Sequence, residues 1–320
     1  MLDVTINKDA VRVGLRFAIS FQRTLRIPDD GRTYPLPPGL GRLPILRVED
    51  YPDRVPLAWR DCGGAFIPMY QREALWLGFH AASWKPNAVK IAVGKVNAIS
   101  GEPDDAALHA DHQDYVVCPD QPWLDGIHTA HEFIRQFVAM PLGLGYTVEA
   151  SMTGMENVGG IQVRVYEPLP GKFPDEPPIK ADAGPVRSAM PKAGGITSMG
   201  LGAGGAMKQK IYPDRYGIEV WDQGNYGQIF VHIINSLQFF KITGLEPPPL
   251  PINAKTYTEY GLPWFDLYDE TKGDVPPSER LAWVKTISAR DVERGEPVQA
   301  DVSFEVSESQ IKKLHKPIPG

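Results

Sequence analysis

The sequence predicts a mainly β fold, with antiparallel sheets packed as a sandwich or barrel, a few short helices and long Pro/Gly-rich loops. Apolar and polar residues alternate over several segments, which puts one set of side chains on one strand face. The chain also holds 31 glycines and 31 prolines in 320 residues, spread between the apolar segments. Such residues mark turns and interrupt helices, so short strands fit better than long helices or βαβ units.

The composition is that of a globular chain, with 42% hydrophobic and 22% charged residues. A net charge of −6 without a basic stripe argues against nucleic-acid binding. The apolar runs fall short of the roughly 20 residues of a membrane-spanning helix. The first residues lack the basic and apolar regions of a signal peptide. With Cys62 and Cys118 interpreted as free thiols, these features predict a cytoplasmic protein.

The clearest strand is predicted over residues 11–27. Every second residue from Val11 to Phe21 is apolar, and Leu25 and Ile27 keep the same parity. This set, Leu15 included, would line one face of a sheet until the turn residues that follow Ile27. Further strands are expected over residues 45–48, 73–79 and 88–99.

A hairpin is predicted over residues 145–167. Its two strands, 146–150 and 161–166, flank a connection that contains Gly154, Gly159 and Gly160. The preceding apolar segment, residues 133–140, fits either a short helix beginning near His128 or a buried strand.

Residues 168–206 hold a run of prolines followed by a run of glycines, which predicts irregular structure. We therefore divide the chain into an N-terminal β-rich half (1–167), a Pro/Gly-rich connecting segment (168–206) and a C-terminal β-rich half with short helices (207–320). The two halves are also compatible with one intertwined domain.

In the C-terminal half, strands are expected over residues 208–212, 217–221, 228–234 and 301–306. A short helix over residues 235–242 ends at Gly244. Pro247, Pro248 and Pro249 favour an extended stretch. Ser278 is the expected N-cap of a helix that continues through Leu281, Val284 and Ile287.

Several phrases of the sequence resemble a family of uncharacterised bacterial proteins that includes actinobacterial members. The similarity spans most of the chain and is carried by residues 71–79 (QREALWLGF), 118–126 (CPDQPWLDG), 133–143 (FIRQFVAMPLG) and 261–270 (GLPWFDLYDE). Members are sometimes labelled membrane proteins, which disagrees with the short apolar runs here. The resemblance implies kinship but no activity, cofactor or site residue.

A histidine cluster is the first candidate site. His109 and His112 form one H-x-x-H pair, and His128 and His131 form another, with carboxylates between them. Imidazoles and carboxylates are good ligands for zinc and other divalent metals. However, this spacing aligns two imidazoles only on a helix, and the first pair lies in a polar loop. We favour solvated loop histidines, expect no cofactor, and keep a divalent metal as the minority hypothesis.

The aromatic and acidic segment 257–270 is the second candidate, with Trp264, Asp266, Tyr268 and Asp269 as possible ligand-binding residues. Aromatic faces stack on sugar rings, and paired carboxylates hydrolyse glycosides. The favoured interpretation is that Trp264 anchors a loop on the core while the acids face water.

The glycine-rich segment 200–210 is the third candidate, because consecutive amides can cradle a phosphate. It lacks the preceding strand and following helix of a dinucleotide site, so a flexible loop is favoured. No G-x-S-x-G motif is present, and neither cysteine sits in a cationic setting. The catalytic residues, if any, are therefore unknown.

The leading functional hypothesis is a non-enzymatic β-scaffold protein that acts in protein–protein binding or self-assembly, with a homo-oligomer or another protein as partner. The alternative is a carbohydrate-active or metal-dependent hydrolase that uses the acids near Trp264. Strand-rich patterning and apolar loops outside any catalytic motif favour the first.

Overall fold

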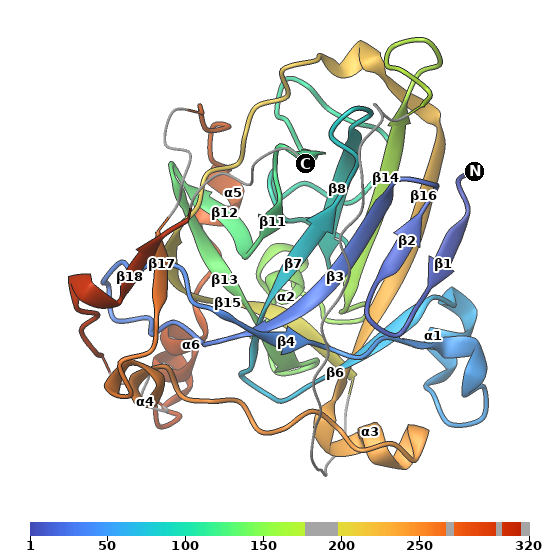
Figure 1. Ribbon diagram of the computed structural model, residues 1–320. Helices are drawn as coiled ribbons and strands as arrows, with labels where there is room; N and C mark the ends of the chain where they lie inside the picture. Colours follow the sequence, from blue (N-terminus) through green and yellow to red (C-terminus); the bar gives the residue numbers. More distant parts are fainter. Residues whose placement is uncertain (177–197, 267–271, 299–302, 315–320) are drawn as a thin grey trace.

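A computed structural model describes residues 1–176, 198–266, 272–298 and 303–314. Over these residues the chain forms one large, mainly antiparallel sheet and one two-stranded sheet, and its helices are short (Figure 1). The predicted mainly β class is confirmed, although the large sheet does not close into a barrel. None of the described helices is long and apolar enough to cross a membrane.

The large sheet is a continuous path of strands with short strands attached at its sides. The path runs through β1 (Val4–Ile6), β2 (Val11–Val13), β3 (Phe17–Thr24), β7 (Ala74–His80), β13 (Phe133–Pro141), β15 (Ser198–Lys208), β16 (Trp221–Asn235), β14 (Ile161–Pro168), β8 (Asn87–Val93) and β10 (Val116–Cys118). The attached strands are β4 (Gly39–Arg42), β5 (Leu46–Arg47), β6 (Ala65–Met69), β9 (Val96–Asn97), β11 (Trp123–Leu124) and β12 (Gly126–Ala130). β6 pairs with β16 in parallel. The second sheet joins β17 (Trp264–Asp266) to β18 (Ile311–Lys313), also in parallel.

The helices begin and end at residues that satisfy their terminal backbone groups. They are α1 (Leu57–Cys62), α2 (Val148–Thr153), α3 (Ser236–Thr243), α4 (Ala254–Glu259), α5 (Glu279–Ala282) and α6 (Ile287–Arg294), with 3-10 turns at Val48–Asp50, Ile218–Val220 and Glu308–Gln310. The side chains that accept from first-turn amides are those of Thr147, Asn235, Asn253, Ser278 and Thr286. Gly154, Gly244 and Gly295 end their helices in the left-handed conformation.

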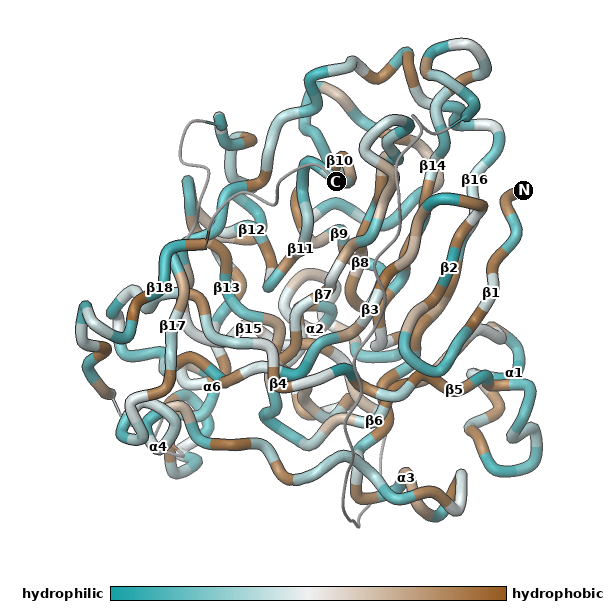
Figure 2. Tube along the Cα trace, in the orientation of Figure 1, coloured by the Kyte–Doolittle hydropathy of each residue, from teal (hydrophilic) through white to brown (hydrophobic). Residues whose placement is uncertain are grey.

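One hydrophobic core draws on almost every strand of the path. Fully buried residues such as Ile19, Ile91, Phe137, Val163 and Val231 all belong to the same cluster. Because strands far apart in the path share this cluster, the sheet must curl around a single core. Brown, hydrophobic stretches recur along β3, β8 and β14 in Figure 2.

The single strand predicted over residues 11–27 is wrong, because the segment is a hairpin of β2 and β3. Gly14, with φ of 61°, opens the turn between them, and Leu15 at its tip is 89% exposed. Val13 pairs with Phe17 across the turn. The turn has three residues, so the apolar parity continues unbroken through it and periodicity alone cannot detect it.

The first strand of the predicted 145–167 hairpin is also wrong, since residues 148–153 form α2. The Thr147 hydroxyl accepts from the amide of Ala150 at 3.0 Å, and Gly154 ends the helix with φ of 75°. The second predicted strand is confirmed as β14. The ambiguous segment 133–140 is a strand, β13.

The predicted irregular segment 168–206 is wrong over its last residues, because the glycine-rich part is β15, in the middle of the sheet. Residues 177–197 lie outside the described residues. A Cβ at Gly202 would lie 2.7 Å from the carbonyl oxygen of Tyr146, and one at Gly205 would lie 2.2 Å from that of Pro28. The glycines therefore allow other backbone segments to pack directly on the strand.

The two predicted halves share the large sheet. β13 and β14 of the N-terminal half pair with β15 and β16, which follow them in the chain. Strands from both sides of the proposed connecting segment therefore belong to one sheet.

In the C-terminal half, the expected strand at 228–234 is confirmed within β16, and the helix at 235–242 is confirmed as α3. The single helix predicted from Ser278 is wrong, since α5 ends at Ala282 and Thr286 caps a separate helix, α6. The strand expected at 301–306 falls partly outside the described residues, and residues 303–306 have no regular structure. The strand expected at 217–221 is wrong except for Trp221, because residues 218–220 form a 3-10 turn that leads into β16.

An extended arm follows α3 and leads to α4 (Figure 1). The Tyr70 hydroxyl donates to the carbonyl oxygen of Pro248 at 2.8 Å, and the Arg23 guanidinium donates to that of Pro249 at 2.6 Å. Leu250, one residue further on, is 70% exposed. Side chains from the β3–β7 region thus hold the arm through its carbonyl groups.

We expect Gly205→Ala to lower the free energy of unfolding by about 2 kcal/mol or more, because the new methyl group would collide with backbone atoms that cannot rotate away. Gly224→Ala in β16 is the matched control, since its Cβ would meet only the Asp222 carboxylate at 3.5 Å. Equilibrium urea denaturation measures both. Equal stabilities of the two variants would contradict the role given to β15.

Candidate functional site

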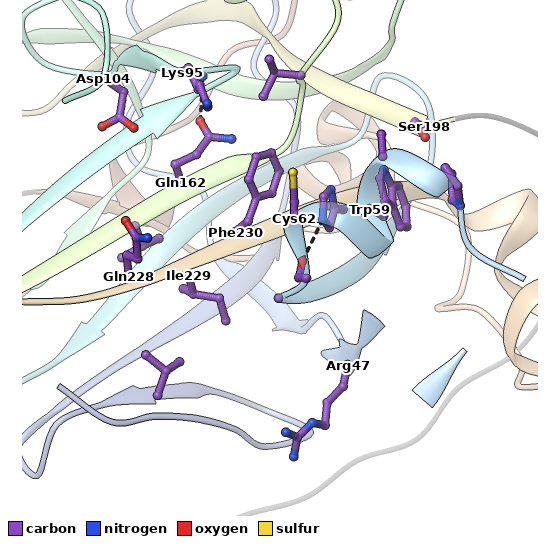
Figure 3. A pocket seen from close by; sticks show the side chains of 18 of the residues that line it. Arg47, Trp59, Cys62, Lys95, Asp104, Gln162, Ser198, Gln228, Ile229 and Phe230 are labelled. Atoms are coloured by element: carbon purple, nitrogen blue, oxygen red, sulfur yellow. Dashed lines mark hydrogen bonds between the residues drawn. The ribbon is translucent and has the colours of Figure 1, made fainter. Parts of the chain in front are cut away.

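A groove of about 640 Å³ runs along β14 and β16 and is lined by side chains from both strands (Figure 3). The core residues Val163 and Ile229 contribute to its lining. The other residues that β14 and β16 contribute share one strand face and form the floor, and they are Gln162, Arg164, Gln228, Phe230 and His232. Helix α1 forms one wall, and the turn after β8 forms another. A groove of this volume falls in the range of ligand-binding pockets, roughly 300–1,000 Å³.

An aromatic stack crosses one end of the groove. The His232 ring lies between the rings of Trp59 on α1 and Phe230 on β16, with centroid distances of 4.5 and 4.3 Å. Its Nε2 donates to the carbonyl oxygen of Gly63 at 3.1 Å. Burial lowers the pKa of His232 to about 4, so the imidazole is neutral near pH 7. The close approach of α1 depends on Gly64, where a Cβ would lie 2.2 Å from the carbonyl oxygen of Phe230.

Polar side chains at the other end are fixed by hydrogen bonds. Gln162 accepts from the amide of Lys95 at 2.7 Å and donates to the carbonyl oxygen of Gly159 at 3.0 Å. Arg164 forms an ion pair with Asp104 and donates through Nε to Gln228 at 3.2 Å. The groove therefore presents a preformed polar surface beside an aromatic one.

Two potential nucleophiles, Cys62 and Ser198, also line the groove. Within the part of the chain that the structure describes, neither is hydrogen-bonded to a histidine or carboxylate side chain. An activated nucleophile needs such a base. The groove thus lacks, among these residues, the pairing that nucleophilic catalysis uses.

Of the four predicted metal-binding histidines, His109 lies with Asp105 and Asp114 in a group whose ligand atoms are all within 4.8 Å of one another. The Lys90 ammonium already lies 2.5 Å from Asp105 Oδ1 and 2.7 Å from Asp114 Oδ2. The ammonium group of Lys90 therefore lies between these two carboxylates. His112 is exposed and does not belong to the group.

His128 and His131 converge instead on Asp274. His131 Nδ1 lies 2.8 Å from Asp274 Oδ2, and the buried His128 Nε2 lies 3.6 Å from the same atom. The amides of Glu132 and Ile211 donate to the two carboxylate oxygens at 2.6 and 2.8 Å. Asp274 thus ties the β12–β13 hairpin to the segment that follows β15. His109 therefore lies beside different carboxylates from His128 and His131.

The predicted aromatic and acidic site is only partly described. Trp264 is fully buried, and its indole N–H donates to the hydroxyl of Thr258 at 3.1 Å. Its ring packs edge-on against Tyr257, so it presents no open face to a sugar. Asp266 is half-buried on β17, whereas Tyr268 and Asp269 lie outside the described residues.

The groove residues were missed because the polar positions of an alternating strand are ordinarily assigned to solvent. Gln162 and Arg164 share one face of β14, and Gln228, Phe230 and His232 share one face of β16. The rings of Phe230 and His232, on a strand face that the pattern assigns to solvent, were the signal that could have indicated the groove. The sequence pattern gave no information on the pairing of β14 with β16 or on the position of α1 beside them.

Comparison with protein-family models, with curated proteins and with solved structures gives no match. The resemblance to uncharacterised bacterial proteins therefore stays a prediction.

The stability of the protein should depend on pH through His232. In the unfolded chain the imidazole of His232 becomes protonated as the pH falls below 6.5. In the folded protein it becomes protonated only near pH 4. Stability contributed by the neutral ring is therefore present above pH 6.5 and is lost as the pH falls, by about 3 kcal/mol at most. We expect His232→Gln to reduce the difference in unfolding free energy between pH 7 and pH 4.5. An unchanged difference would contradict this.

Asp274→Asn should lower the free energy of unfolding by about 2 kcal/mol, because an amide has one acceptor oxygen for two buried N–H donors. His131→Ala is the control, since its side chain is 69% exposed and its loss should cost less than about 1 kcal/mol. Urea titration at pH 7 compares them. If both variants lose the same stability, Asp274 does not fasten the hairpin as described.

Proposed function

We propose that this chain is a non-enzymatic, cytoplasmic binding protein that holds an extended segment of another polypeptide in the groove over β14 and β16. The observation that carries the proposal is that this groove is amphipathic and open while Gln162 and Arg164 on its floor are already held by hydrogen bonds and an ion pair. A preformed surface binds without the cost of ordering its side chains.

Binding is favoured over catalysis by the state of the ionisable groups. His232 is neutral and is held by stacking and a hydrogen bond. Asp104 is neutralised by Arg164, and its side chain is only 4% exposed. A general acid or base must be able to exchange a proton with its substrate near the working pH. His232, whose pKa is lowered to about 4, is poorly suited to that task.

A polypeptide segment fits the arrangement of the floor. Arg164 lies opposite Gln228, and Gln162 lies opposite Phe230, in the β14–β16 register. Side chains that share a strand face repeat at about 7 Å, the same repeat that an extended peptide offers. Apolar residues Val4 and Ile6 of β1 also line the groove. The segment can belong to another protein or to a second copy of this chain, which would make a homo-oligomer.

The hydrolase alternative has less support. The Trp264 ring is buried in the core rather than open to a sugar. Lys90 occupies the space between the carboxylates grouped with His109. A carbohydrate ligand for the groove itself is still a distinct outcome of the experiment below, since exposed aromatic rings also stack on sugars.

The experiment selects binders from a random peptide library against the wild-type protein. Selected peptides should lose at least about tenfold in affinity with Phe230→Ala, which removes an aromatic wall, as interface anchors typically cost more than 1 kcal/mol. Trp283→Ala is the matched control, because that ring is 84% exposed and lies outside the groove.

A glycan array probes the same proteins in parallel. The proposal is contradicted if no peptide depends on Phe230, or if a glycan shows that dependence instead. Light scattering at micromolar concentration identifies the second-copy form, which predicts an oligomer that Phe230→Ala converts to monomer.

A further inference from the structure

A second and smaller cavity, of about 190 Å³, is separate from the groove. Its walls come from β7, β11, β17 and the segment that leads into β4, and they include the rings of Trp76, Trp123 and Phe265. This volume is below the roughly 300–1,000 Å³ of pockets for drug-sized ligands. The cavity suits a small chemical group rather than a nucleotide or an oligosaccharide.

The aromatic walls are held in place by backbone pairing. Trp123 pairs with Gly78 between β11 and β7. The amide and carbonyl groups of Leu36 and Phe265 exchange hydrogen bonds at 2.8 and 3.0 Å. Gly39 faces Trp76, and a Cβ there would lie 3.3 Å from the indole ring. The cavity is therefore preformed, with a glycine that leaves room for one of its rings.

A buried carboxyl group, that of Asp125, also lines the cavity and is only 3% exposed. Gln209 donates to Asp125 Oδ2 at 2.8 Å and accepts from the Asp125 amide at 3.0 Å. The Trp123 side chain supplies a further hydrogen bond. Both donors are neutral, so the hydrogen bonds orient the carboxyl group without compensating its charge.

We propose that this cavity is a binding site for a small organic cation of the alkylated ammonium type. Three aromatic rings line the cavity, and an aromatic ring attracts a cation through its quadrupole, most strongly where the cation is desolvated. The Asp125 carboxylate supplies the compensating charge. A methylated ammonium group also has an apolar surface that matches the largely apolar walls, which a hydrated metal ion or a free ammonium does not.

The protonation of Asp125 gives the site a pH dependence. Burial raises the pKa of this carboxyl group to about 7. The carboxylate form attracts a cation and the neutral acid does not, so affinity should rise as the pH increases through 7. Binding should release up to one proton.

The test uses the full-length protein with choline and with 3,3-dimethylbutan-1-ol, the neutral compound of the same shape. Isothermal titration calorimetry at pH 8 should show saturable choline binding, with the neutral compound at least about tenfold weaker, as expected for a desolvated cation–π site. Choline affinity should fall roughly tenfold between pH 8 and pH 6, the change in carboxylate fraction for a group with a pKa near 7.

Two variants locate the site. Asp125→Asn keeps the side-chain shape and should remove both the pH dependence and the preference for the cation. Trp76→Leu should weaken choline binding at least about tenfold by removing one aromatic face. Phe230→Ala, in the groove, should leave it unchanged, which separates this inference from the proposed function.

The inference is overturned if the wild-type protein does not bind choline at millimolar concentration, or binds the neutral compound equally well. It is also overturned if choline affinity is the same at pH 6 and pH 8. These three outcomes need only the wild-type protein, so they decide the matter even if Asp125→Asn does not fold.

Discussion

The centre of the sheet is organised by β15, whose glycines let other backbone segments pack directly against it. Glycines at positions 202 and 205 let the carbonyl groups of Tyr146 and Pro28 pack where side chains would otherwise stand. β15 joins β13 along most of its length and meets β16 through Ser198 and Met199. β16 in turn carries the groove. Bulkier side chains on β15 would push apart the segments that set the position of β16.

Buried carboxylates fasten the long loops to this sheet. Glu149 accepts from three consecutive amides, at 157–159, and Asp291 accepts from Arg72 and Tyr146. Asp214 accepts from the side chains of Tyr115 and Trp221. A protein rich in irregular segments has many backbone and side-chain donors without a regular partner, and a carboxylate satisfies two or more of them at once. Asp274 and Asp114 have the same role, since each accepts hydrogen bonds from backbone amides.

The sequence predicted β7, β14, the second half of β16 and, within the longer strand expected at 88–99, β8. The prediction failed where local geometry outweighed the pattern. The turn at Gly14 preserved apolar parity, the α2 segment is too short for its period to be recognised, and β15 has glycines where side chains would show alternation. In each case the local structure is decided by contacts with another part of the chain or by a single backbone angle.

The candidate sites were harder to predict because they depend on tertiary neighbours. A metal site at His109 was the minority hypothesis, and the sequence could not show that Lys90, from β8, lies between the carboxylates beside this histidine. Trp264 was correctly expected to serve as a core anchor. The groove requires strands about 60 residues apart to lie side by side, which the register of β14 and β16 supplies. Neither β14 nor β16 contains a local motif that indicates its pairing with the other strand.

The arm after α3 has a consequence for the behaviour of the folded protein in concentrated solution. Four of its residues, Pro247, Pro248, Pro249 and Pro251, have no amide hydrogen to donate. The arm lies near β3 and β7, held by Arg23 and Tyr70, yet it offers no ladder of donors to which a strand of a neighbouring molecule can add. A segment of ordinary residues in the same extended path would be a template for aggregation, and the prolines remove that hazard.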